Sequence, residues 1–191
     1  TPLLSDNNYY EPLNNIVAYG LRNPWKTLEY DNKLYIVDIG LRYYEELTVI
    51  DLALDANKKY KSKLLGWPIF EGPYKTIDTY TIEVQNEENA ELEKFGFNGA
   101  LSFISKNKHY TELFHWNNNN PESAIDFIYN ESIAPQVFYD HQTDLIIRAA
   151  LIGGDIITDN NSSYQGNYFF SDYLTKELFA YNHLENLVTI F

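Results

Sequence analysis

Apolar residues along the chain cluster in short runs that end at turn-forming residues. One apolar run at 16–19 ends at Gly20, and a second at 33–39 ends at Gly40. Residues 46–50 alternate between the two faces of a third segment. Because these segments lie close together and are joined by short turns, the pattern predicts an antiparallel meander instead of βαβ units.

The strand pattern returns in the last third of the chain. Six short apolar segments are expected to form strands: 137–139, 146–147, 150–152, 156–157, 168–170 and 178–181. Glycine and polar clusters predict turns between them at Gly153-Gly154, 159–161 and 165–167. Residues 95–130, which include four consecutive Asn, carry no clear period.

These segments recur as loose four-strand blocks of the length of a propeller blade, about 40–50 residues. We therefore expect an all-β fold, a β-propeller fragment of about three four-stranded blades. This partial propeller domain spans residues 1–191, with blade-like blocks near 12–84 and 134–185 and an irregular insertion near 85–133.

Composition narrows the function classes. Aromatic residues make up 16% of the chain, which suits strands better than a helical bundle. The net charge of −13 argues against nucleic acid and anionic membrane surfaces as partners. The chain has no Cys, which excludes disulfides and thiolate metal sites, and no apolar run has the length of a membrane span. Neither a P-loop nor a G-x-S-x-G motif is present.

Three segments carry a family resemblance. They are AYGLRNPW at 18–25; LYIVDIG at 34–40 with Glu45-Glu46, GWP at 66–68 and EG at 71–72; and PQVFY at 135–139 with His141, Gly153-Gly154 and GNYFFSDY at 166–173. Together they resemble the C-terminal half of the glucose/sorbosone dehydrogenase family, soluble six-bladed propellers that bind pyrroloquinoline quinone (PQQ). The resemblance covers roughly residues 12–84 and 134–181.

The resemblance implies an oxidoreductase: PQQ-dependent oxidation of an aldose sugar by a periplasmic or secreted quinoprotein. It also implies that the catalytic residues belong to the missing N-terminal half of the propeller. Half a propeller leaves open sheet faces, so its expected partners are that missing half or a second copy, together with the sugar substrate.

The resemblance places Arg22, Asn23 and His141 at the cofactor. A guanidinium can form two parallel hydrogen bonds to a carboxylate of PQQ, and an amide can fix the orientation of the cofactor. For Arg22 the alternative is that it pairs with an acidic neighbour and closes a turn. For His141 the alternative is a bond to a neighbouring backbone group.

The carboxylates of Asp38, Glu45 and Glu46 suggest a calcium site, because calcium prefers carboxylate and carbonyl oxygens. The family uses calcium near this loop. The alternative is a solvated turn with Glu45 exposed. Asp172 is expected to bond within a turn or between blades.

Two other functions stay open. One is a non-catalytic extracellular binding propeller that resembles hedgehog-interacting proteins. Polar residues expected to contact PQQ are replaced by apolar Trp25, Ile39 and Leu174, and these replacements favour the binding propeller. The other is a calcium-dependent hydrolase on a six-bladed propeller, which predicts carboxylates that converge on the central axis.

Overall fold

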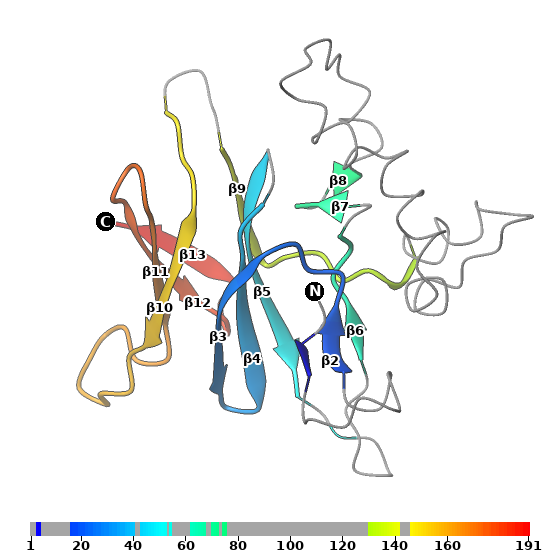
Figure 1. The fold of residues 1–191 in the computed structure, drawn as a ribbon. Coiled ribbons are helices and arrows are strands. Elements are labelled where there is room, and N and C mark those ends of the chain that lie inside the picture. The colour runs from blue at the N-terminus through cyan, green and yellow to red at the C-terminus, as the bar shows by residue number, and fades with distance from the viewer. Residues whose placement is uncertain are drawn as a thin grey trace, which may run out of the picture. The chain divides into compact units, whose positions relative to one another are not determined.

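The computed structural model describes residues 3–4, 16–40, 43–52, 54, 62–67, 70–72, 74–75, 130–141 and 146–191. Apart from two helical residues at 130–131, the regular elements within these ranges are β-strands, so the all-β prediction is confirmed. The chain divides into two compact units (Figure 1). Unit 1 comprises residues 1–21 and 54–134, and unit 2 comprises residues 22–53 and 135–191.

Unit 1 contains two small sheets among its described residues. One sheet has the order β1 (Leu3–Leu4), β2 (Ile16–Tyr19), β6 (Lys63–Leu64), and the other pairs β7 (Phe70–Glu71) with β8 (Tyr74–Lys75). After β2 the backbone turns at Gly20, whose φ is +77°. A Cβ at this position would lie 2.9 Å from the Gly66 nitrogen, so the YGL segment requires glycine.

The first sheet of unit 2 contains four antiparallel strands. Its order is β3 (Pro24–Tyr30), β4 (Lys33–Asp38), β5 (Tyr44–Asp51), β9 (Val137–Asp140). The β3–β4 hairpin turns at Asp31 and Asn32, which both have positive φ, as a type I′ turn requires. Strand β9, which lies far along the chain, pairs with β5. Unit 2 therefore combines residues 22–53 with residues 135–191, and its boundaries differ from those of the predicted block near 12–84.

The second sheet of unit 2 is a simple meander. It runs in chain order through β10 (Leu151–Ile156), β11 (Tyr168–Asp172), β12 (Leu178–Asn182) and β13 (Leu187–Ile190). Both sheets thus have the four-stranded antiparallel form of a propeller blade. The number of blades stays a prediction, and the predicted insertion at 85–133 lies almost wholly outside the described residues.

Two local predictions are wrong. Gly153-Gly154 does not form a turn; both glycines lie within β10, where the pairing with β11 is irregular. A Cβ at Gly154 would collide with the Phe169 carbonyl, so glycine is needed here for close strand approach and not for a turn. The apolar pair at 146–147 lies outside the strands.

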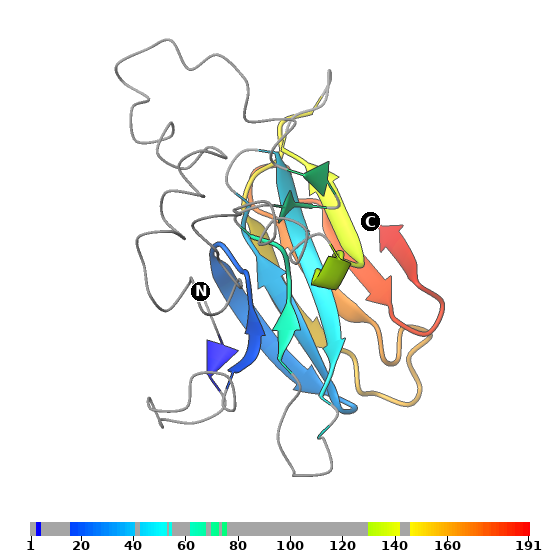
Figure 2. The ribbon, with the colours of Figure 1, turned by 90° about the vertical axis from the view of Figure 1, so that its right-hand side faces the viewer.

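The two sheets of unit 2 enclose a common core. Side chains alternate along each strand, so one face of β4 and β5 meets one face of the second sheet. Tyr35 stacks on Tyr168 with 5.2 Å between ring centroids, and Phe170 stacks on Phe179 at 5.0 Å. Figure 2 shows these sheets as neighbouring layers. Each such aromatic side chain contributes about 2–3 kcal/mol through burial.

Because neighbouring strands run in opposite directions, the connections of unit 2 gather at two edges (Figure 1). The upper edge contains the starts of β3, β5, β10 and β12 and the ends of β4, β9 and β11. The lower edge contains the β3–β4 and β12–β13 hairpins and the segment before β11. No helix long and apolar enough to cross a membrane occurs in the part of the chain that the structure describes.

Candidate functional site

The Arg22-Asn23 pair lies at the upper edge, in a turn that Asp38 holds in place. The Arg22 backbone N–H donates to Asp38 Oδ2 at 2.9 Å, and the Asn23 N–H donates to Oδ1 at 2.6 Å. The Arg22 guanidinium donates through Nη1 to the carbonyls of Ile39 (3.0 Å) and Gly40 (2.6 Å). The turn leaves Arg22 half-buried and Asn23 exposed. Arg22 therefore closes this turn through backbone carbonyls.

Burial controls the ionisation of Asp38. The side chain is 5% exposed, and desolvation raises its pKa to about 6. The two N–H bonds from Arg22 and Asn23 act in the opposite direction, because they favour the charged carboxylate. The clamp that positions Arg22 and Asn23 thus depends on a carboxyl group that titrates in mildly acidic solution.

Glu45 is fully buried, which excludes the solvated-turn alternative for this residue. Its two carboxylate oxygens accept hydrogen bonds from the backbone N–H groups of Ala150 (3.0 Å) and Leu151 (3.2 Å). These bonds join the start of β5 to the start of β10. Glu45 is therefore a structural link between the two sheets of unit 2.

His141 lies at the end of β9, with Nε2 2.6 Å from Glu45 Oε1. The approach is close, but this nitrogen forms no hydrogen bond of good geometry with the described residues. The contact becomes an ion pair when the imidazole is protonated. The His141 side chain thus approaches a carboxylate and not a backbone group, whereas its main-chain N–H donates to the Tyr43 carbonyl at 2.7 Å.

The structure does not bring the three expected calcium ligands together. Asp38 pairs with Glu46 across β4 and β5, so these two side chains share one face of the sheet. Glu45 points to the other face, because neighbouring residues of a strand alternate. Within the described ranges, no group of three acidic or histidine side chains is close enough to hold a metal ion.

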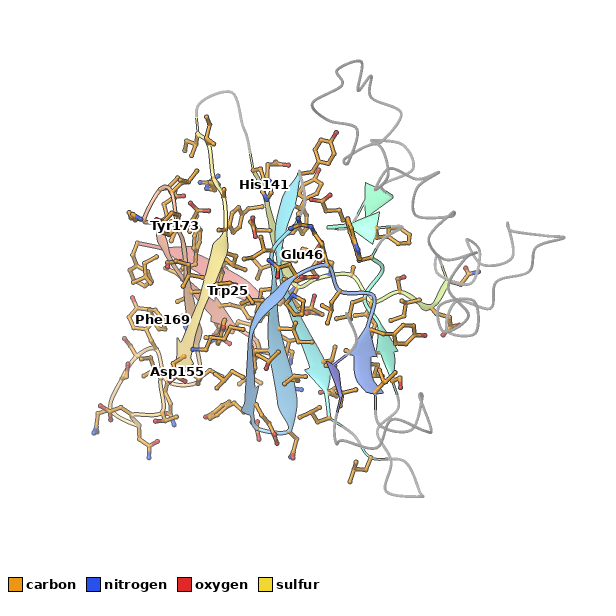
Figure 3. The ribbon with its side chains drawn as sticks, viewed as in Figure 1. Trp25, Glu46, His141, Asp155, Phe169 and Tyr173 are labelled. Atoms are coloured by element: carbon orange, nitrogen blue, oxygen red, sulfur yellow. The ribbon has the colours of Figure 1, made fainter. Side chains whose placement is uncertain are left out.

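The expected cofactor residues are likewise split. Arg22 and Asn23 precede β3, whereas His141 follows β9, at the opposite margin of the same sheet. Three strand spacings separate these margins, about 14 Å. In Figure 3 His141 lies at the end of β9, above and apart from Trp25 on β3. Arg22 and Asn23 can share one ligand, and His141 belongs to a separate cluster.

That cluster includes Tyr139, which the sequence did not single out as a candidate site residue. Tyr139 donates its hydroxyl to Asp172 Oδ2 at 3.0 Å, and burial followed by the charge of Asp172 raises the pKa of Tyr139 far above its usual value. Asp172 also accepts N–H bonds from Leu174 and Thr175, both at 2.9 Å. Asp172 therefore bonds within a turn and between the two sheets, as expected. The period-2 spacing of Tyr139 and His141 is the sequence signal that could have placed them on one face.

Arg148 completes the upper edge. It forms a two-pronged ion pair with Glu177, with distances of 2.7 and 3.0 Å, and lies 5.8 Å over the ring of Tyr139. The Glu177 bond raises the pKa of Arg148, and the same bond lowers the pKa of Glu177. The exposed apolar residues at this edge include Trp25, 64% exposed, and Leu174, 50% exposed.

Comparison with protein-family models, with curated proteins and with solved structures found no match. The family resemblance consequently depends on the motifs quoted from the sequence.

Proposed function

We propose that this chain forms part of a PQQ-dependent, sugar-oxidising propeller in which Arg22 and Asn23 contact the cofactor. The periplasm or the extracellular space is the corresponding location. The remaining blades come from the missing N-terminal half of the propeller or from a second copy. The observation that carries the proposal is the clamped turn: both oxygens of Asp38 fix the backbone of Arg22 and Asn23, and the Asn23 side chain reaches solvent.

The residues at this turn fit one acidic group of the cofactor. The guanidinium of Arg22 supplies positive charge, and the amide of Asn23 supplies both a donor and an acceptor. The carboxylate of Asp38, which holds this turn, is engaged by two backbone N–H groups, which offset its charge. PQQ carries three carboxylates, so further cationic groups have to come from the rest of the propeller.

Each described residue has a limited task in this scheme. Arg22 neutralises a ligand carboxylate, and Asn23 orients the ligand relative to the turn. PQQ, when bound, supplies the quinone that accepts the electrons of the sugar. Because Asp38 fixes the turn before a ligand arrives, little conformational entropy is lost on binding.

A second candidate is a non-catalytic binding propeller. The observation in its favour is the exposure of Trp25 beside Asn23. Trp and Arg are enriched at the energetic centres of protein interfaces, and an exposed Trp three residues after Arg22 fits such a centre. This candidate needs no cofactor.

Dye-linked sugar oxidation by the full-length gene product, with and without added PQQ, tests the proposal. We expect PQQ-dependent dye reduction with an aldose, and a tenfold or greater loss of PQQ affinity in Arg22→Gln, because a charged hydrogen bond contributes about 1.5–3 kcal/mol. Lys176→Asn is the matched control: it removes another cation near the upper edge, and Asn tolerates the positive φ at this position.

Absence of PQQ-dependent turnover, or an equal loss in the control, would overturn the enzyme proposal. The binding propeller would then be tested by partner capture with wild type and Trp25→Ala.

A further inference from the structure

The lower edge of unit 2 contains a hollow of about 270 Å³ between its two sheets. Its walls come from the β3–β4 hairpin, the segment before β11 and the β12–β13 hairpin. The volume falls just below the range of about 300–1,000 Å³ typical of drug-sized ligands, so the hollow suits a small molecule.

The first sheet contributes two aromatic rings and two opposite charges. Tyr30 and Tyr35 line the hollow together with Asp31 and Lys33. Tyr35 is 2% exposed, and its pKa is raised by burial first and then by the nearby Tyr181 and Asp31. Lys33 forms an ion pair with Asp51. These contacts place hydroxyl, carboxylate and ammonium groups around one small space.

The second sheet contributes neutral polar groups. Gln165, Asn182 and His183 line the opposite side. Asn182 Oδ1 accepts the Leu184 N–H at 3.0 Å, and Gln165 Nε2 donates to Asn160 at 2.7 Å, so both amides are held in position. Burial, and then the charge of Lys33, lower the pKa of His183, which favours the neutral imidazole. A neutral imidazole offers one donor and one acceptor.

The lining thus combines donors and acceptors with little net charge. The charge of Lys33 is offset by Asp51, and an anion would face Asp31 within a chain of net charge −13, so the hollow disfavours anions. A sugar ring presents many hydroxyls that both donate and accept, and its C–H face can lie on the half-buried ring of Tyr30. We infer that the lower-edge hollow is a binding site for a neutral monosaccharide or a terminal sugar residue.

This inference stands apart from the proposed function. The hollow lies at the opposite edge from Arg22 and shares no residue with the clamped turn. A variant that removes one site should leave the other intact, so the inference and the proposed function can be tested separately.

Saturation-transfer NMR with D-glucose, D-galactose, D-mannose and N-acetylglucosamine, using the intact protein, tests the inference. We expect at least one sugar to bind with a millimolar Kd, an energy of about 4 kcal/mol. Asp31→Asn should weaken binding tenfold or more; Asn tolerates the positive φ of 49° at this position, so the hairpin is retained. Glu185→Gln in the neighbouring hairpin is the matched control and should bind as wild type does.

Three results would overturn the inference: no transfer from any of the four sugars, equal binding by wild type and Asp31→Asn, or preferential binding of methylammonium or phosphate probes. Arg22→Gln should leave the sugar signal unchanged. If Arg22→Gln removes it, the sugar binds at the upper edge.

Discussion

The two edges of unit 2 use polar side chains differently. At the upper edge the carboxylates of Asp38, Glu45 and Asp172 are buried and accept backbone N–H groups, so they fix turns and join sheets. At the lower edge Asp31 and Lys33 surround a hollow. Acidic residues in a motif can thus stabilise the fold itself. The candidate ligand contacts then come from other residues, which the folded backbone holds at the edge.

The largest expected effect comes from removing the Glu45 carboxylate. Glu45→Ala leaves two backbone N–H groups and His141 without their buried partner, which should cost about 3–5 kcal/mol of unfolding free energy. Urea unfolding of Glu45→Ala and of the exposed control Glu185→Ala measures the difference. A loss below about 1 kcal/mol would show that the upper edge does not depend on this link.

A pH effect of smaller size is expected from Asp38. Its folded pKa of about 6 lies above the unfolded value near 3.9, so the folded state binds the extra proton between these values. Stability should therefore fall by about 1–3 kcal/mol as the pH rises from 4 to 6.5, because one pKa unit corresponds to about 1.4 kcal/mol.

Comparison of wild type with Asp38→Asn across this pH window isolates the effect from that of other carboxylates. The variant should lack this part of the pH slope. Parallel slopes in both proteins would contradict the burial of a titrating Asp38.

Removal of one hydroxyl from the upper edge should have a moderate effect. Tyr139→Phe takes a donor from the buried Asp172 and should cost about 1–2 kcal/mol, while stacking on Phe179 is retained. Thermal unfolding measures it, with Tyr173→Phe, an exposed tyrosine at the same edge, as the control. Equal melting temperatures for the two variants would count against the Tyr139–Asp172 bond.

The smallest stability effect is expected at the lower edge. Asp31→Asn should change the unfolding free energy by less than about 0.5 kcal/mol, because the residue is exposed and the turn tolerates Asn. The same denaturant experiment measures it. A large loss of unfolding free energy would mean that Asp31 also stabilises the fold, and the two edges would then no longer differ in this respect.

The sequence predicted the fold class and several strands well. Val137, Tyr168 and Leu178 begin apolar runs that the structure confirms as strands β9, β11 and β12. Strand β3 was missed because its sequence PWKTLEY does not alternate in polarity: Lys26 is partly buried, whereas Trp25 is exposed. The Gly153-Gly154 pair was misread because a turn and a close strand approach both require glycine.

The arrangement at the edges was less predictable. The sequence singled out Arg22 and Asn23 but did not show that Asp38, in the next strand, clamps them. It grouped Glu45 with Glu46, although strand alternation sends their side chains to opposite faces. The lower hollow joins hairpins that are far apart in the chain, so only the tertiary structure reveals it.

The most direct test of the central claim is an equilibrium titration of the full-length protein with PQQ, repeated with Arg22→Gln and Asp31→Asn. The clamped turn predicts saturable binding that Arg22→Gln weakens at least tenfold and that Asp31→Asn leaves unchanged. No saturable binding, or the same affinity in wild type and Arg22→Gln, would contradict it.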